Sequence, residues 1–284
     1  MRNQVFKYLS QCSTKPNEVD RLIISAFLYK NKIEVKKNEF LKSFMIQENE
    51  RNEFDTLQKF ISIIELEIPK FEFEELIELF EFVISPADRI INGAIYTPLN
   101  IREFIIKQSF HSKRYSLATA KVADIACGCG GFLFNAAKQL KKRTDKSYVE
   151  IFKTQIFGLD IQSYSIIRTK LLLSLLALSE GEDIREFQFN LFEGDALTFK
   201  WSENLNRFSG FDIILGNPPY VCSRHITEET KIKLEKWEVC KSGHPDLYIP
   251  FFQIGIENLS DDGILGFITM NSFFKSLNGR ALRE

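Results

Sequence analysis

One segment joins an apolar run to a glycine-rich turn and then to a second apolar run: Val122-Ala-Asp-Ile-Ala-Cys-Gly-Cys-Gly-Gly-Phe-Leu133. Its first residues, 122–126, have the composition of a buried strand, and residues 132–140 have the spacing of a helix. Glycine permits positive φ in a tight turn and lets a ligand approach the backbone closely. The segment therefore predicts a strand, a ligand-binding turn and a helix in succession.

Downstream of this segment, short apolar runs alternate with longer amphipathic runs. Further strands are expected at 154–161, 187–192, 211–215 and 264–269, and helices at 164–179 and 247–259. Strands that alternate with helices of this length indicate a parallel, doubly wound α/β sheet. We therefore expect a Rossmann-like core over residues 86–284.

Residues 1–85 differ in character, because they contain no glycine and the first glycine of the chain is Gly93. Their content of Glu, Lys, Leu, Ile and Phe favours helices, and Leu76, Ile77 and Phe80 fall at helical spacing. We expect a small amino-terminal helical domain of three to five helices over residues 1–85.

Composition places the chain among ordinary globular proteins. Of its 284 residues, 44% are hydrophobic and 26% are charged, which argues against disordered and membrane-spanning classes. Its first residues lack the apolar centre of a signal peptide, so a cytoplasmic location is expected. The formal net charge of −1 gives no global basic field, so any binding of nucleic acid must depend on local charge or on another part of the protein.

Three acidic residues, Asp124, Asp160 and Asp195, follow successive predicted strands. Each could be a helix cap or a solvated carboxylate, but together they outline a polar slot at one sheet edge, where such folds bind ligands. The G-x-G-G turn at 128–131 lacks the G-x-G-x-x-G fingerprint of dinucleotide sites. These features favour a nucleoside cofactor without a diphosphate, namely S-adenosylmethionine.

The most specific motif is Asn217-Pro218-Pro219-Tyr220, directly after a predicted strand. Two prolines stiffen the loop and remove two N–H donors, so it presents acceptors: the Asn217 side-chain oxygen and the Pro218 carbonyl. Two acceptors suit a conjugated NH₂ group, whose lone pair becomes available when both N–H groups are held. An aromatic ring such as Tyr220 can stack on a planar substrate.

With the turn Asp124-x-x-Cys-Gly-x-Gly, this motif resembles the amino-group methyltransferases that use S-adenosylmethionine. Tyr96-Thr97-Pro98 ahead of the turn is similar to the segment found in DNA adenine-N6 methyltransferases of the gamma motif order, from type IIG enzymes and type I modification subunits. From the residues alone, Thr97 is also expected to cap a helix that starts at Pro98. Asp246-Leu-Tyr and residues 262–283 extend the resemblance to about 88–284.

The resemblance implies site residues, a substrate and partners. Asn217, Pro218, Pro219 and Tyr220 would hold a target adenine flipped out of double-stranded DNA. The implied cofactor contacts are Tyr96, Thr97, Pro98, Asp124, Ala126, Gly128, Gly130, Phe132, Asp160, Ile161, Asp195 and Ala196. A target-recognition domain or specificity subunit and a restriction endonuclease are the implied partners, and no membrane is involved.

The family's sheet has two more strands and a recognition domain beyond the point that corresponds to Glu284. We therefore expect a core that lacks its last strands and methylates DNA inefficiently alone. A catalytically impaired fragment or binding subunit of a split methyltransferase, a protein-glutamine N5 methyltransferase and an RNA adenine methyltransferase remain alternatives.

Two further patterns receive a weaker interpretation. Asp20 with Glu34-Val-Lys36 imitates the acidic pattern of metal-dependent nucleases, but it lies in sequence that favours helices. The five cysteines form no CxxC pair, so no metal site is expected.

Overall fold

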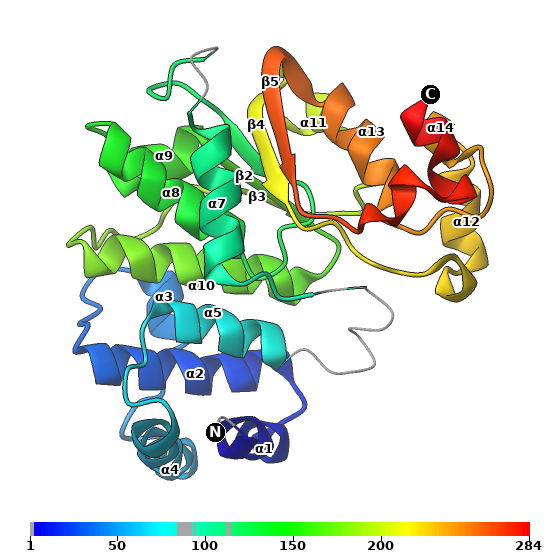
Figure 1. The fold of residues 1–284 in the computed structure, drawn as a ribbon. Coiled ribbons are helices and arrows are strands. Elements are labelled where there is room, and N and C mark those ends of the chain that lie inside the picture. Colours follow the sequence, from blue (N-terminus) through cyan, green and yellow to red (C-terminus); the bar gives the residue numbers. More distant parts are fainter. Residues whose placement is uncertain (1–2, 84–92, 94, 112–114) are drawn as a thin grey trace.

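A five-stranded sheet with the order β3-β2-β1-β4-β5 organises the second half of the chain (Figure 1). The structure is a computed structural model that describes residues 3–83, 93, 95–111 and 115–284. All neighbouring strands pair in parallel. The strands are β1 (Val122–Asp124), β2 (Ile156–Asp160), β3 (Asn190–Glu193), β4 (Phe211–Gly216) and β5 (Leu259–Phe267). The predicted doubly wound α/β fold is confirmed.

The strand bounds differ slightly from those expected. Thr154 was predicted to begin the second strand, but it is the last residue of α9 (Tyr148–Thr154). The third strand starts at Asn190, because Phe187 and Phe189 pack instead against Phe152 of α9.

Helices cover both faces of the sheet. One face carries α7 (Leu99–Ser109), α8 (Gly131–Arg143), α9 and α10 (Ser163–Ser179), and the other carries α11 (Trp201–Asn204), α12 (Glu228–Leu234) and α13 (Ile249–Glu257). Successive side chains of β4 point to opposite faces of the sheet. Ile213 and Leu215 belong to the cluster of buried side chains on the first face, and Ile214 belongs to the cluster on the second. Short 3-10 helices at Ser223–His225, Glu238–Cys240, Asn271–Phe274 and Leu277–Gly279, with α14 (Arg280–Arg283), complete the described elements of this half.

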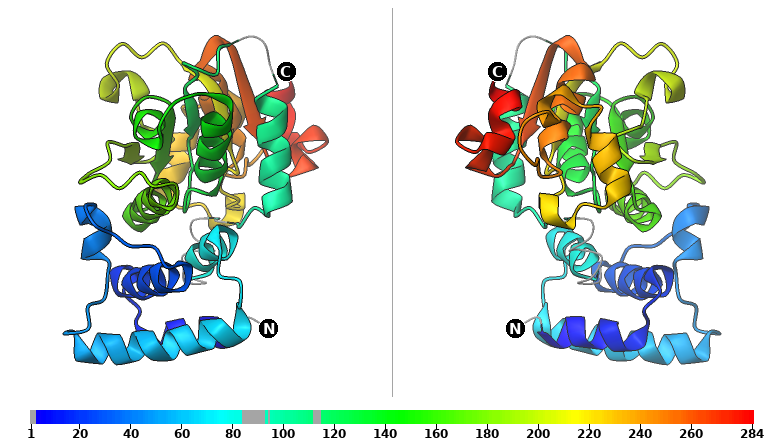
Figure 2. Two further views of the ribbon diagram at one scale, coloured as in Figure 1. Left: turned by 90° about the vertical axis from the view of Figure 1, so that its left-hand side faces the viewer. Right: turned by 90° about the vertical axis from the view of Figure 1, so that its right-hand side faces the viewer.

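The amino-terminal helices lie against α10, on the side away from the sheet (Figures 1 and 2). They are α1 (Asn3–Cys12), α2 (Pro16–Asn31), α3 (Glu39–Ser43), α4 (Arg51–Glu67) and α5 (Phe73–Phe82). One hydrophobic cluster runs from Phe27 and Phe80 of these helices through Leu172 of α10 to Val122 of the sheet. The helices are thus packed onto the core and share its interior.

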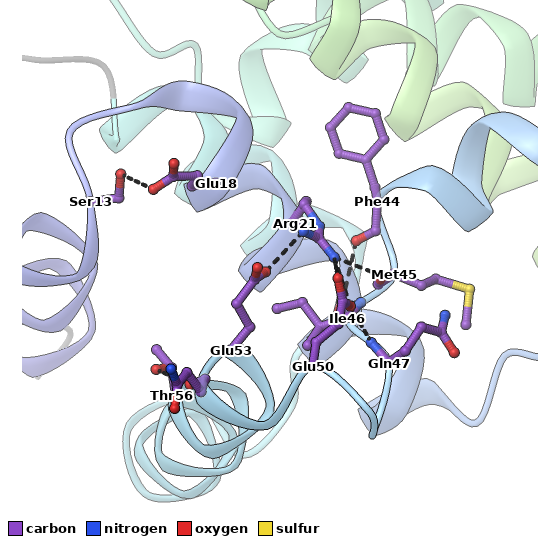
Figure 3. A network of polar contacts seen from close by, with 12 residues as sticks. Ser13, Glu18, Arg21, Phe44, Met45, Ile46, Gln47, Glu50, Glu53 and Thr56 are labelled. Carbon is purple, nitrogen blue, oxygen red and sulfur yellow. Dashed lines mark hydrogen bonds and ion pairs between the residues drawn. The ribbon is translucent and has the colours of Figure 1, made fainter.

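Within the amino-terminal helices, Arg21 organises a polar network (Figure 3). Its guanidinium contacts Glu50 and Glu53, each at 2.9 Å, and also donates to the Met45 carbonyl. The network joins α2 to the start of α4.

A buried ion pair fastens these helices to α10. Arg168 Nε donates to Asp20 Oδ1 at 2.9 Å, and Arg168 Nη1 donates to the Phe80 carbonyl at 2.8 Å. Asp20, the first residue of the nuclease-like pattern, is therefore committed to a structural contact. Glu34 instead pairs with Lys36 at the surface, so the structure does not assemble that pattern into a site.

Among the described residues, no helix combines the length and the apolar character that crossing a bilayer requires.

Candidate active site

A cavity of about 290 Å³ opens at the carboxyl ends of the parallel strands. Side chains at four strand ends line it: Asp124 of β1, Asp160 of β2, Asp195 after β3 and Asn217 after β4. Parallel strands bring their ends to one edge of the sheet, so residues distant in sequence meet there. The structure thus brings together the three predicted acids and the most specific motif.

Asp160 ties β2 to the glycine-rich turn. Its Oδ2 accepts the Gly128 N–H at 2.8 Å, and its Oδ1 accepts the Gln162 N–H at 2.9 Å. Burial raises the pKa of this carboxyl above its usual range. The carboxylate both shapes the turn and faces the cavity.

Asp124 is almost fully buried at the end of β1, and its Oδ1 accepts the Ala126 N–H at 3.1 Å. Burial, helped by the charges of Asp160 and Glu81, raises the pKa of Asp124 to about 8. A positive ligand in the cavity would relieve this unfavourable concentration of carboxylates.

Asp195 has a partner that the sequence did not indicate. Its Oδ1 accepts the Leu197 N–H at 2.9 Å, and its Oδ2 contacts Lys233 Nζ of α12 at 3.0 Å. Lys233 therefore links α12 to the β3 end of the cavity, which Ile226 and Thr227 also line.

The amide of Asn217 is held in one orientation. Its Nδ2 donates to the Ile95 carbonyl and to Thr97 Oγ1, both at 3.0 Å. Its Oδ1 is buried and has no hydrogen-bond partner among the described residues. Two acceptors fix the nitrogen, so the oxygen remains available to a donor from a ligand.

The expectation that Thr97 caps a helix beginning at Pro98 is wrong. Helix α7 begins at Leu99 with extended Pro98 ahead of it, and it has no side-chain cap. Because the Thr97 hydroxyl accepts from Asn217, it serves the loop after β4 rather than the helix.

The same two segments also meet through their backbones. The Tyr220 N–H donates to the Gly93 carbonyl at 3.0 Å, and Gly93 has a φ of 64°. A Cβ at position 93 would lie 2.5 Å from the Tyr220 nitrogen, so only glycine fits here. The Asn217–Tyr220 loop is therefore docked on the segment that precedes α7.

The predicted site residues fall into two groups. The cavity is lined by Tyr96, Thr97, Asp124, Ala126, Gly128, Phe132, Asp160, Ile161, Asp195, Ala196, Asn217 and Pro219. Four others, Pro98, Gly130, Pro218 and Tyr220, lie beside it without contributing to the lining. The Tyr220 hydroxyl donates to the Ile268 carbonyl at 2.8 Å, and its ring lies 5.9 Å from that of Tyr248.

Sequence reasoning missed a buried hub, Arg102 of α7, which also lines the cavity. Its Nε donates to the Thr97 carbonyl at 3.0 Å, its Nη1 to the Gly131 carbonyl at 2.9 Å, and its Nη2 contacts Glu74 at 2.5 Å. Glu74 also accepts from the Tyr96 hydroxyl. Helix α5 is thus coupled to the walls of the cavity, although nothing in the local pattern around Arg102 signals this.

Cys127 and Cys129 are buried in the glycine-rich turn. Across the described residues, no three His, Cys, Asp or Glu side chains gather closely enough to hold a metal ion.

Comparison with known proteins connects this site to one class of enzyme. The Eco57I restriction-modification methylase family matches residues 154–284. The type II methyltransferase M.BstVI of Geobacillus stearothermophilus is 27% identical over 202 residues, which cover 68% of this chain and 36% of the relative. The proteins that this chain matches in sequence are thus methyltransferases of restriction–modification systems. The type II restriction enzyme and methyltransferase RM.Eco57I of Escherichia coli is 26% identical over 260 residues, which cover 73% of this chain and 26% of that protein.

This chain therefore spans only about a third of the M.BstVI length and about a quarter of the RM.Eco57I length.

Solved structures share the fold. The type IIG restriction endonuclease BpuSI matches with a TM-score of 0.65 at 16% identity, over 93% of this chain and 32% of BpuSI. The type IIL enzyme MmeI in complex with DNA matches with a TM-score of 0.59 at 16% identity, over 98% of this chain and 46% of MmeI. A Listeria monocytogenes protein assigned to the class I S-adenosylmethionine-dependent methyltransferases matches with a TM-score of 0.51 at 16% identity, over 98% of this chain and 77% of that protein. This chain shares its fold with these three proteins.

Proposed function

We propose that this chain transfers a methyl group from S-adenosylmethionine to the N6 amino group of adenine in DNA, within a restriction–modification system. One observation carries the proposal: the Asn217 amide nitrogen is anchored twice, and its buried oxygen has no partner in the part of the chain that the structure describes. A buried acceptor without a partner is costly, so a substrate donor is expected to satisfy it.

The cavity suits the proposed cofactor. It holds the carboxylates of Asp124, Asp160 and Glu81 at one end of the sheet. Bound S-adenosylmethionine would supply an electrophilic methyl group on a positively charged sulfur. We infer that Asp195 and Ala196 face its adenine, Asp160 its ribose hydroxyls, and Asp124 its methionine end. Tyr96, Thr97 and Phe132 would form the surrounding wall.

The acceptor amine would bind at the loop after β4. Asn217 Oδ1 and the Pro218 carbonyl would accept its two N–H groups and reduce the delocalisation of its lone pair into the ring. The lone pair would then form the bond to the methyl carbon as the bond between that carbon and the cofactor sulfur breaks, its electron pair staying on the sulfur of S-adenosylhomocysteine, and the nitrogen would give one proton to solvent. Catalysis by this loop would consist of positioning and electrostatic stabilisation in a site built before the substrate arrives.

Adenine in DNA is favoured over other amides and amines by the restriction–modification relatives and by the contacts of Gly93, Ile95 and Thr97 with the Asn217–Tyr220 loop. The target base would leave the duplex to reach the cavity, and Tyr220 would offer it an aromatic contact. We further propose a recognition domain or subunit and an endonuclease as partners, and the cytoplasm as the site of action.

Product analysis tests the function. The protein is incubated with unmethylated DNA and S-adenosylmethionine labelled in the methyl group, and the DNA is digested to nucleosides for mass spectrometry. Label is expected in N6-methyldeoxyadenosine. Label in a methylcytosine, or in protein glutamine when a protein substrate is offered, would contradict the proposal. Cofactor binding without any transfer would favour the binding-subunit alternative.

The affinity for S-adenosylmethionine is expected to rise with pH. The pKa of Asp124 is about 8, so much of the free protein carries a proton there at neutral pH, and the positive cofactor prefers the ionised form. Affinity should increase by up to about tenfold per pH unit below that pKa and then level off. Calorimetric titrations between about pH 6 and pH 9 measure this.

The stability of the free protein should change in the opposite direction. Because the native pKa of Asp124 lies above its unfolded value, its stabilising contribution is greatest at low pH and is lost as pH rises through about 8. In an Asp124→Asn variant both pH dependences should flatten. Unchanged pH profiles in that variant would show that another group is responsible.

A further inference from the structure

The chain that leaves the Asn217–Tyr220 loop returns to the cavity at its β3 end. Three residues just before and within α12 line the cavity there: Ile226, Thr227 and Thr230. At the other end of α12, Leu234 is buried and belongs to the same cluster of side chains as Ala196, which follows β3. Helix α12 therefore forms part of the cavity wall beside the residues that follow β3.

The ammonium group of Lys233, on this helix, lies between two carboxylates. Its Nζ is 3.0 Å from Oδ2 of Asp195 and 2.7 Å from Oε1 of Glu229. The Asp195 side chain is 23% exposed and that of Glu229 is 80% exposed, so solvent screens the pair with Asp195 less. The hydrogen bonds to Glu229 and Asp195 raise the pKa of Lys233, which keeps the ammonium group charged.

Protein donors orient both oxygens of the Asp195 carboxylate. The Leu197 N–H donates to Oδ1 at 2.9 Å, and Lys233 Nζ donates to Oδ2 at 3.0 Å. An ionised carboxylate offers about four lone-pair sites, so each oxygen has room for a further donor. Asp195 also lines the cavity, so a ligand there can supply that donor.

We propose that Lys233 is a positioning residue that holds the Asp195 carboxylate ready to accept the 6-amino group of the cofactor adenine. The assignment rests on the proposed function, which places the adenine at Asp195. A carboxylate that is already oriented loses less side-chain freedom when the ligand binds. Helix α12, which lies outside the predicted motifs, thereby takes part in selecting an adenosyl cofactor.

Two ligands isolate the contact at the 6 position of the purine. S-adenosylhomocysteine carries an amino group there and S-inosylhomocysteine carries an oxygen, while the sugar, sulfur and amino acid are the same. Both are titrated calorimetrically into the wild type, Lys233→Met and Lys231→Met. Lys231 lies on the same helix and contacts Glu228 at 2.7 Å at the surface, so its replacement removes an equal charge and serves as the matched control.

The wild type is expected to prefer S-adenosylhomocysteine, because the Asp195 carboxylate accepts from an amino group and repels a 6-oxo group. Lys233→Met should lower the affinity for S-adenosylhomocysteine by about fivefold to tenfold. Its affinity for S-inosylhomocysteine should stay within about twofold of the wild type, which also shows that the variant is folded. Lys231→Met should match the wild type with both ligands.

An Asp195→Ala background tests whether Lys233 acts through that carboxylate. The alanine should abolish the preference between the ligands, and adding Lys233→Met should then lower neither affinity further. The assignment would be overturned by a wild type without the preference, by an equal loss or no loss for both ligands in Lys233→Met, or by a further loss in the double variant. A wild type that binds neither ligand would instead refute the proposed function.

Discussion

Replacing Asn217 by alanine is expected to lower the rate of methyl transfer by about 10²–10³-fold and to leave S-adenosylmethionine affinity nearly unchanged. The alanine removes the buried Oδ1 acceptor, and the amine is then no longer held for attack. Asn217 lies after β4, while the proposed adenosine contacts lie at β2 and β3, so binding of the cofactor should be retained. Single-turnover transfer of labelled methyl at saturating cofactor, with a parallel calorimetric titration, measures both quantities.

Two further variants sharpen the assignment. Asp160→Ala should weaken cofactor binding, and high cofactor concentration should restore most of its rate. Thr97→Val removes one of the two acceptors that orient the Asn217 amide, so an intermediate loss of rate with normal cofactor affinity is expected. Wild-type rates in the Asn217 variant, or a loss explained entirely by cofactor binding, would refute the mechanism.

The elements that carry local signals were predictable from the sequence. Apolar runs between glycine-containing turns marked all five strands, and the parallel topology then placed Asp124, Asp160 and Asp195 at one edge. Asn217 was recognisable because two prolines after a strand are rare and restrictive. Its orientation was not, because that depends on Ile95 and Thr97, which are distant in sequence.

Contacts made by charged residues on helices were not predictable. Arg102, Glu81 and Lys233 lie in amphipathic sequence, where a solvated charge is the usual interpretation, and tertiary packing alone turns them toward the cavity. One overlooked signal did exist. Residues 171–178 in α10 are apolar on every side, and a helix of that kind is buried on every side. That pattern indicates a second layer, which the amino-terminal helices supply.

Replacing Arg168 by methionine is expected to destabilise the packing of the amino-terminal helices on α10. Asp20 is 1% exposed, and its carboxylate would lose its guanidinium partner without access to water. Removing one member of a buried ion pair costs about 3–5 kcal/mol, so the free energy of unfolding measured in urea should fall by that amount. The Phe80 carbonyl loses its donor as well.

A double replacement separates charge from packing. Asp20→Leu combined with Arg168→Met removes both charges and keeps apolar volume, so most of the lost stability should return. Lys200→Met removes a cation from an exposed pair with Glu203 and should leave unfolding unchanged. If Arg168→Met also leaves unfolding unchanged, the amino-terminal helices are not fastened to the core through this pair.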